Sequence, residues 1–293
     1  MAELQDRQWE LDGRLLMGRR TKFIVGDPDF DAAEVIGDPV AAPRADGQRW
    51  GRGYRGGRTI TLDITVNCHT PAEGRLAAAE LEAAWDAADI RSTPGGLSVL
   101  RWQYAGETRR VYGRTGQLAT ATTTFDRAGR IDYTAEFTTV DHLFYGDTVE
   151  QTVVPFVPAE LGGLVGSQVG GWSATTAGTA SGVVDVNGSS PSWLTWTIRG
   201  PIVNPTIEVT GLWSATLNMS LAYDQSVTVD PTPWNRSVRR NDGASFAGAF
   251  TSTSERLSRM RVPPGVVQVL LKGVDPSGTS SLTAQVRPVH ATY

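Results

Sequence analysis

Alternating apolar and polar residues recur along most of this chain and predict β-structure. The clearest case is residues 59–67, where Ile60, Leu62, Ile64 and Val66 alternate with polar side chains. Successive side chains of a strand point to opposite faces, so this pattern indicates a strand with one buried face. The other segments predicted as strands are residues 8–17, 22–25, 97–104, 107–113, 116–124, 130–138, 193–198, 212–217, 226–230, 266–271 and 282–287.

Turn residues separate these segments and predict how they connect. Ala105-Gly106, Arg114-Thr115 and Arg127-Ala128-Gly129 divide residues 97–138 into an antiparallel meander. Asn241-Asp242-Gly243 predicts a hairpin and Asp275-Pro276-Ser277-Gly278 a type I turn. The sequence therefore predicts sheets built from neighbouring antiparallel strands.

Two segments carry more specific predictions. Residues 200–209 read GPIVNPTIEV, so the breaker pairs Gly200-Pro201 and Asn204-Pro205 predict a loop that leads into a strand. Residues 266–271 are apolar almost throughout, which predicts a central strand buried on both faces. Residues 158–192 are rich in Gly, Ser, Thr and Ala, and we expect weak edge strands and loops there.

One helix is predicted, over residues 71–90. Thr70-Pro71-Ala72-Glu73 is a capping box with proline at the first helical position. Ala77, Leu81 and Trp85 then follow at helical spacing, and acidic residues occupy the remaining positions. We interpret those acidic residues as a solvated face rather than a metal site.

Residues 26–58 form a long segment between the predicted strands 22–25 and 59–67. Its first part, residues 26–47, is rich in Asp, Pro and Gly and is expected to lack regular structure; it is either a surface loop or a contact segment. Residues 49–58 read RWGRGYRGGR. Interleaved arginine and aromatic residues can bind single-stranded nucleic acid, but this stretch is short and runs directly into the strand 59–67, so we interpret it as a bend.

Charge divides the chain into two parts. Residues 1–150 hold 18 basic and 23 acidic residues, a net charge of −5, whereas residues 151–293 hold 9 and 8, a net charge of +1. This shift predicts a domain boundary near residue 150, with domains 1–150 and 151–293. Neither part has the clustered positive charge typical of a specific nucleic-acid-binding protein. No stretch predicts a membrane span or a signal peptide, so we expect a soluble protein made in a cytoplasm.

Candidate chemistry is sparse, and the sequence predicts neither an enzyme nor a metal or cofactor site. Cys68, the only cysteine, adjoins His69 at the expected helix start, where a thiol pKa can fall, but we expect Cys68 to pack at the domain edge. Asp224 and Asp230 could form the carboxylate pair of a sugar hydrolase, yet turn positions explain them more simply. The sequence contains no Gly-x-Ser-x-Gly motif, no His-Glu-x-x-His motif and no phosphate-binding glycine loop.

Five of the nine tryptophans fall in the second part of the chain. We expect Trp193, Trp196 and Trp213 to fill the core of a β-sandwich or jelly roll. Trp172 and Trp234 lie in loop-like contexts and could instead contact a glycan or a partner protein.

The order of these motifs resembles the distal tail proteins of long-tailed bacteriophages, often labelled minor tail proteins. The second part carries GPIVNPTIEVTG, then VTVD, a hairpin at Asn241-Asp242-Gly243, a Pro-Pro-Gly turn and DPSG. The first part has two strands, a long loop, a strand, a helix and a meander, and ends in residues 141–145 (DHLFY). The usual family ending has proline where this chain has His142. The resemblance covers nearly the whole chain.

This resemblance implies a mainly β fold. The N-terminal domain would be ring-forming and split-barrel-like, with one α-helix and an extended arm at residues 26–58, and the C-terminal domain would be a galectin-like β-sandwich. It also implies a structural virion protein at the tail tip, synthesised in the bacterial host, whose subunits form a homohexameric ring. The implied partners are the tail tube protein, the tape-measure protein and receptor-binding proteins.

The resemblance also gives candidate contact residues. The arm would supply the ring interface through Trp50, Arg52, Tyr54 and Arg55. The negative N-terminal charge predicts an acidic inner wall that repels the passing genome. Two alternatives from other classes stay open. One is a carbohydrate-binding module that contacts the host wall through Trp172 or Trp234, and the other is a wall-degrading hydrolase, which requires converging carboxylates.

Overall fold

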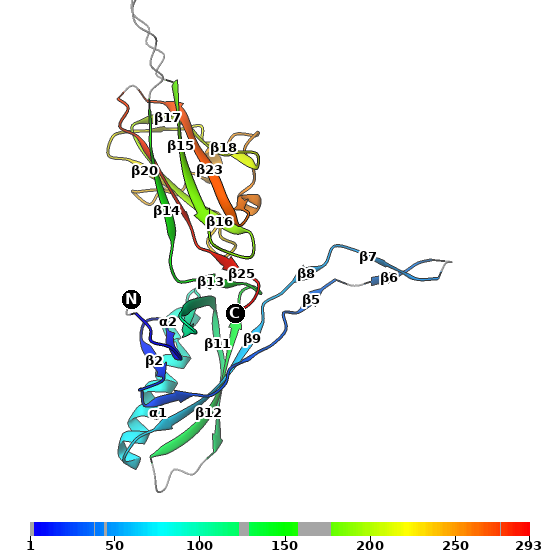
Figure 1. Cartoon of the computed structure of the whole chain (residues 1–293), viewed down its shortest axis with the longest axis vertical. Coiled ribbons are helices and arrows are strands. Elements are labelled where there is room, and N and C mark those ends of the chain that lie inside the picture. The colour runs from blue at the N-terminus through cyan, green and yellow to red at the C-terminus, as the bar shows by residue number, and fades with distance from the viewer. Residues whose placement is uncertain (1–2, 38, 44–45, 123–128, 158–176, 276) are drawn as a thin grey trace, which may run out of the picture. The chain divides into compact units, whose positions relative to one another are not determined.

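The computed structural model of the chain describes residues 3–37, 39–43, 46–122, 129–157, 177–275 and 277–293 (Figure 1). The chain forms two compact units, the first Met1–Asp147 with Ala291–Tyr293 and the second Thr148–His290. Strands dominate both, so the predicted mainly β fold is confirmed. Among the described residues, no helix has the length and apolar character needed to cross a membrane.

A single antiparallel sheet organises the first unit. Its strands run in the order β2-β1-β10-β11-β12-β9-β3, while β4 also pairs with β9 and β13 with β11. Their bounds are β1 Gln8–Leu11, β2 Leu15–Gly18, β3 Phe23–Val25, β4 Asp29–Phe30, β9 Thr59–Asn67, β10 Ser98–Tyr104, β11 Glu107–Thr122, β12 Arg130–Thr139 and β13 Phe144–Gly146. The predicted strand 59–67 is confirmed: Ile60, Leu62, Ile64 and Val66 are all buried.

Two predicted strand boundaries in this sheet are wrong. Residues 8–17 form a hairpin, because Asp12 and Gly13 adopt positive φ angles of 53° and 69° and turn β1 back as β2. Strand β11 runs through the expected turn at Arg114-Thr115, with an irregular register between Thr115 and Leu118. A β-bulge of this kind bends a strand without ending it.

The helix α1 spans Pro71–Asp86 and packs against β9, β11 and β12. Thr70 caps it, since its Oγ1 accepts the backbone N–H of Glu73 at 3.2 Å. Leu81 and Trp85 face the core as predicted. The predicted end near residue 90 is wrong, because Ala87 adopts a φ of 40° and starts a separate short helix, α2 Ala88–Arg91.

Short paired strands occupy the arm, contrary to the expected absence of regular structure in its first part. β5 (Val35–Ile36) pairs with β8 (Tyr54–Arg55), and β6 (Pro39–Ala41) pairs with β7 (Gln48–Trp50). Figure 1 shows the β5–β8 pair nearer to β9 and the β6–β7 pair farther out along the arm. Each is too short to produce a recognisable alternation, so only the antiparallel register reveals them.

The second unit is a β-sandwich, as predicted. One sheet has the order β14-β24-β16-β20-β21 with β22 paired to β16, and the other has the order β15-β23-β17-β18 with β19 paired to β17. The bounds are β14 Glu150–Pro155, β15 Ala177–Val186, β16 Ser192–Arg199, β17 Ile202–Val209, β18 Trp213–Thr216, β19 Ser220–Leu221, β20 Ser226–Asp230, β21 Ser237–Arg240, β22 Arg261–Val262, β23 Gly265–Val274, β24 Ser281–Val286 and β25 Val289–His290. Trp193, Trp196 and Trp213 are buried, as predicted.

Two predictions for this sandwich need correction. Strand β17 runs through Asn204-Pro205, where a φ of 48° at Asn204 and a register shift against β23 mark a bulge rather than a loop. Strand β23 is central but not buried on both faces, because Val266 is 73% exposed while Val267 and Val269 are buried. The face of β23 that carries Val266 lies on the outside of the sandwich, and the face that carries Val267 and Val269 lies against the core.

Asp275 stabilises the turn between β23 and β24. Its buried carboxylate accepts hydrogen bonds from Ser277 N (2.8 Å), Ser277 Oγ (2.7 Å) and Ser280 N (2.9 Å). Burial acts to raise its pKa, but these bonds dominate and lower the pKa from 3.8 to about 2. A shift of this size corresponds to about 2 kcal/mol of folding free energy.

We therefore expect Asp275→Ala to lower the free energy of unfolding by about 2–3 kcal/mol at pH 7, since buried donors lose their acceptor. The folded-state pKa is depressed, so this contribution is present above about pH 4 and disappears as the pH falls towards 2. Denaturant titrations at pH 7 and pH 3 measure the difference. Asp242→Ala is the matched control: the hydrogen bond from Arg240 also lowers the Asp242 pKa to about 2, but this carboxylate is exposed and screened by solvent, so its loss should change stability much less.

Candidate functional site

The arm exposes the residues that the sequence singles out for a ring interface. Trp50 on β7 is 71% exposed and Tyr54 on β8 is 64% exposed. Arg52, between these strands, and Arg55, on β8, are exposed as well. Apolar side chains of the opposite strands are also exposed, namely Val35, Ile36 and Val40. A patch of solvent-facing apolar side chains on a narrow ribbon is typical of a contact surface.

The returning strand of the arm is strongly basic. Arg49, Arg52 and Arg55 have no ion-pair partner among the described residues, and no acidic residue lies between Gln48 and Arg58. Arg58, at the base, is held differently. Its guanidinium lies 4.4 Å from the centre of the Phe144 ring and donates to the His142 carbonyl. Burial lowers the Arg58 pKa from its ordinary value, with Asp141 opposing this and Arg55 adding to it.

A groove lined by aromatic side chains lies on the first unit, and the sequence did not predict it. Trp9 and Trp102 are register partners on β1 and β10, and their rings stack at 5.1 Å. Phe30 lies 5.6 Å from Trp102 and 4.6 Å from Tyr293. We call this surface the aromatic groove. It has a volume of about 370 Å³, and its further lining residues are Arg7, Val25, Gly26, Asp27, Pro28, Gln103 and Tyr104.

Gln103, a residue of the groove lining, has an unsatisfied side-chain oxygen. Gln103 Oε1 is buried and has no hydrogen-bond partner among the described residues. This oxygen is closed to solvent, so the groove does not expose it to a donor from outside. Asp27, which lines the groove, and Asp29 and Asp31, on and next to β4, are exposed and have no ion-pair partner within the described ranges.

A buried ion network joins three strands of the first unit to Asp147, which follows β13. Arg101 on β10 donates from NH1 to Glu10 Oε1 at 2.6 Å, and from Nε and NH2 to both Asp147 oxygens at 3.0 and 2.7 Å. Arg110 on β11 donates from Nε to Asp147 Oδ1 at 2.9 Å. Burial acts to raise the Asp147 pKa, but the bonds from Arg101 and Arg110 dominate and lower it.

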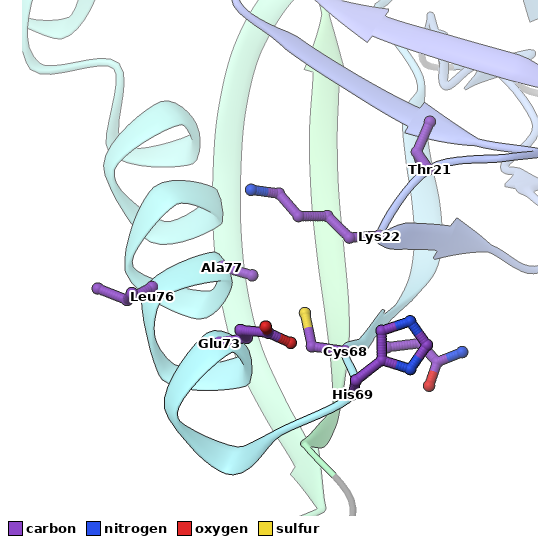
Figure 2. Close-up of a pocket in the computed structure, with 8 residues that line it drawn as sticks. Thr21, Lys22, Cys68, His69, Glu73, Leu76 and Ala77 are labelled. Carbon is purple, nitrogen blue, oxygen red and sulfur yellow. The ribbon is translucent and has the colours of Figure 1, made fainter.

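The Cys68–His69 pair does not form a catalytic arrangement. Figure 2 shows the His69 ring and the Glu73 carboxylate on opposite sides of Cys68, in a depression of about 510 Å³ beside α1. No hydrogen bond joins Cys68 to either residue within the described part of the chain. Lys22, which also lines the depression, is paired with Glu80. Cys68 is half-buried and packs against the edge of the core, as predicted.

The carboxylates considered for a hydrolase also have structural explanations. Asp230 accepts bonds from Thr232 N, Thr232 Oγ1 and Asn235 Nδ2 at 2.6–2.9 Å, which is the pattern of a turn residue. Asp224 lines a polar depression of about 380 Å³ in the second unit, together with Arg199 and Asn241. No group of three or more potential metal ligands occurs among the described residues.

The two tryptophans considered for glycan or partner contact differ. Trp172 lies outside the described residues. Trp234 is half-buried, and its ring lies 6.4 Å from that of Trp193. The Arg261 guanidinium lies 4.0 Å from the centre of the Trp193 ring. Trp234 thus belongs to an aromatic cluster at the surface of the sandwich and is not a freely exposed platform.

Comparison with solved structures identifies the fold. The SPP1 Dit (gp 19.1) protein, described as a paradigm of the hub adsorption apparatus in phages that infect Gram-positive bacteria, matches with a TM-score of 0.56 and 14% identity over 96% of this chain and 98% of that chain. The chain has the fold of a phage tail-hub protein. A chain of the phage P2 baseplate in its activated conformation with Ca matches with a TM-score of 0.56 and 9% identity over 97% and 98% of the two chains.

The same baseplate with Sr gives a TM-score of 0.54 and 9% identity over 95% of this chain and 97% of that one. Hub and baseplate proteins thus share this fold across both units, and the predicted resemblance is confirmed at the level of fold. No protein-family model and no curated protein sequence matches the chain.

Proposed function

We propose that the chain is a structural subunit at the tip of a long phage tail, where copies assemble into a ring. The observation that carries this proposal is a fold shared with hub and baseplate proteins over nearly the whole of both chains. The arm supports it as well, because its apolar side chains are exposed and Arg49, Arg52 and Arg55 have no ion-pair partner within the described part of one copy. A head-to-tail contact repeated with the right rotation closes into a ring.

The two domains take different roles in this proposal. Residues 1–150 form the ring and continue the tail tube, with the arm reaching from each subunit to its neighbour through Trp50, Arg52, Tyr54 and Arg55. Residues 151–293 project outward and carry receptor-binding or other tail-tip proteins, while the tape-measure protein contacts the ring from the tube side. Six copies form the ring, as in the family that the sequence resembles. The work of the protein is assembly and load transfer, with no bond made or broken.

The outer face of β9 and β12 is the best candidate for the ring's inner wall. Asp63, Asp132 and Glu136 lie on this face, opposite the buried core positions of the same strands. Thr65 Oγ1 donates to Asp132 at 2.6 Å and Thr134 Oγ1 donates to Asp63 at 3.1 Å, so threonines hold the carboxylates across the strand pair. An acidic wall repels DNA phosphates and prevents the passing genome from binding. A basic wall in the assembled ring would contradict this assignment.

We expect electron micrographs of the purified protein, at micromolar concentration and low salt, to contain closed rings with a central opening. Low salt is chosen because screening weakens contacts between exposed charges. Class averages give the number of subunits directly, and six is the expected number. Single globular particles or open filaments at every concentration would contradict a ring-forming subunit.

Glycan binding by the second unit is the alternative. Its support is the half-buried Trp234 beside Trp193, and the polar depression lined by Arg199, Asp224 and Asn241. Sugar rings usually stack on an exposed aromatic face, and the lining of the depression contains none. Specific binding to a glycan array that is lost in Trp234→Ala would favour this alternative over a purely structural role.

A further inference from the structure

We propose that the polar depression of the second unit binds an anionic saccharide, one that carries a phosphate or a carboxylate beside its hydroxyl groups. The depression has a volume of about 380 Å³. Every residue of its lining is polar: four carry a hydroxyl group, and the others are Arg199, Asp224 and Asn241. The site goes beyond the proposed ring, because it needs no contact between copies. Unlike the glycan alternative above, it does not use Trp234.

The register of the strands builds this lining on the outer face of the sheet β14-β24-β16-β20-β21. The buried residues of β16 alternate with Thr197 and Arg199, which therefore point to the outer face. Arg199 is the register partner of Ser226 on β20 and of Ser281 on β24. Thr197 is the register partner of Thr283 on β24. Three neighbouring strands thus place one arginine and four hydroxyl groups side by side.

Arg199 and Asp224 bring opposite charges to the depression without pairing with each other. Both residues are exposed, and neither side chain has an ion pair or a hydrogen bond within the described part of the chain. Asn241 fixes the turn that carries Asp224, because its Nδ2 donates to the Asp224 carbonyl at 2.9 Å. The depression therefore offers a ligand one free cationic donor and one free anionic acceptor.

These free groups match the chemistry of an anionic sugar. A guanidinium donates two parallel N–H bonds to a carboxylate or a phosphate, and such charge-assisted bonds are stronger than neutral ones. A carboxylate accepts bonds from hydroxyl groups, and Ser and Thr hydroxyls both donate and accept. Arg199 thus binds the anionic group of the ligand, and Asp224 binds the hydroxyl groups beside it. Because the anion provides the anchor, this site needs no stacking ring.

Basic residues outnumber acidic ones along this face. Arg239 on β21 and Arg261 on β22 are exposed at register positions that point the same way as Arg199. Arg239, like Arg199, has no ion-pair partner among the described residues. Asp230 is the one acidic strand residue described on this face, and its carboxylate already accepts three bonds within its own turn. Three basic residues and one acidic residue give a net charge of +2, which attracts an anion.

The outer face of the other sheet has the opposite charge. There Lys272 is paired with Glu208, and Asp185 on β15 is exposed. One basic and two acidic residues give the described strand residues of that face a net charge of −1. The charge of the sandwich therefore favours an anionic ligand on the face that holds the depression.

The side chains of this face favour a saccharide over a protein or a nucleic acid. Its exposed apolar residues, within the described strands, are confined to the edge strand β14, namely Val153 and Pro155, whereas protein interfaces are usually anchored by central aromatic or arginine side chains in apolar pockets. Trp193, the one aromatic residue on the described strands of this face, is 5% exposed, so nucleic-acid bases have no ring on which to stack.

Binding to immobilised polymers tests the class of ligand. The full chain is applied at low salt, by biolayer interferometry, to polygalacturonate (carboxylates), phosphomannan (phosphates), neutral dextran and polyglutamate, a polyanion without hydroxyl groups. We expect one of the two anionic polysaccharides to bind at least tenfold more tightly than dextran and polyglutamate, and the tighter one identifies the anionic group. Equal binding to dextran or to polyglutamate, or binding to none of the four, would overturn the proposal.

Substitutions separate a saccharide site from a surface that is merely basic. Arg199→Ala should weaken binding to the preferred polymer at least tenfold. Asp224→Ala removes a negative charge and would strengthen binding to a merely basic surface, but it should weaken binding here at least threefold, because the sugar hydroxyls lose their acceptor. Arg256→Ala is the matched control and should change binding less than twofold: Arg256 is exposed, lacks an ion pair among the described residues and follows Glu255, which is bonded to β18 of the other sheet.

Tighter binding of Asp224→Ala, or equal effects of Arg199→Ala and Arg256→Ala, would overturn the site. All three side chains are exposed, so each variant should keep the unfolding midpoint and the mass in solution of the unmodified chain. Specific saccharide binding by a chain that forms no oligomer would support the site and overturn the ring. An oligomer that binds no saccharide would overturn the site alone.

Discussion

Replacing Arg101 with methionine is expected to lower the free energy of unfolding of the first unit by about 3–5 kcal/mol. Its side chain is 4% exposed and binds both Glu10 and Asp147. Methionine keeps much of the side-chain volume but makes no ion pair. Glu10 then loses the bond from Arg101, and Asp147 keeps only the bonds from Arg110 within this network. Removal of one partner from a buried ion pair is strongly destabilising, because the remaining charge stays buried without compensation.

Arg14→Met is the matched control for this prediction. Arg14 also forms an ion pair, with Asp89, but both side chains are more than half exposed. Exposed ion pairs contribute little to stability, so the control should leave the unfolding midpoint in urea almost unchanged. Equal effects of the two substitutions would show that the buried network does not stabilise the first unit.

The same network predicts a pH dependence. The pKa of Asp147 is lowered in the folded state, because the bonds from Arg101 and Arg110 outweigh the effect of burial. Its stabilising contribution is therefore complete above the unfolded-state pKa near 3.9 and is lost as the pH falls through the lower folded-state pKa. We expect the difference in stability between the wild-type chain and Arg101→Met to shrink below about pH 4.

Removal of the arm is expected to abolish self-association without unfolding the first unit. Replacing residues 33–56 by an Asn-Gly turn joins two ends that are already close, because Asp31 N donates to Thr59 O at 3.0 Å. The side chains of β5, β6, β7 and β8 are exposed, so their loss removes no core contact. Thermal unfolding should stay within a few degrees of the wild-type midpoint while the oligomer disappears.

The arm also offers a matched control for its own deletion. An arm of full length that carries Trp50→Ala, Tyr54→Ala, Arg52→Ala and Arg55→Ala keeps the ribbon but loses the proposed contact side chains. It should associate as weakly as the deleted chain. If this variant associates normally, the contact is made by the backbone or by other residues of the arm. If the arm-deleted chain associates normally, the arm takes no part in the contact between subunits.

Local patterns in the sequence predicted the elements that depend on local physics. Strand β9 followed from its alternation, and the start of α1 from the cap at Thr70. The wrong predictions concern strands whose length is determined by the neighbouring strand in the sheet. Strand β11 continues through residues 114–115 because its partner β12 accommodates a bulge, and β17 passes Pro205 for the same reason against β23.

The arm and the aromatic groove differ in how far the sequence predicted them. The arm was recognisable because Trp50, Arg52, Tyr54 and Arg55 are adjacent in sequence. The aromatic groove was missed because Trp9 and Trp102 meet only through the register of β1 and β10, and Phe30 joins them through the pairing of β4 with β9. Non-local register of this kind leaves no local signature, although several large aromatic side chains in strands of one domain suggest that some of them meet.

The mass of the protein in solution tests the central claim most directly. Light scattering across a concentration series, on the wild-type and arm-deleted chains side by side, distinguishes a closed ring from a monomer of 31.5 kDa. The account predicts a discrete wild-type species near six times that mass and an arm-deleted chain at the monomer mass. A wild-type chain that stays at 31.5 kDa up to its solubility limit, indistinguishable from the arm-deleted chain, would contradict it.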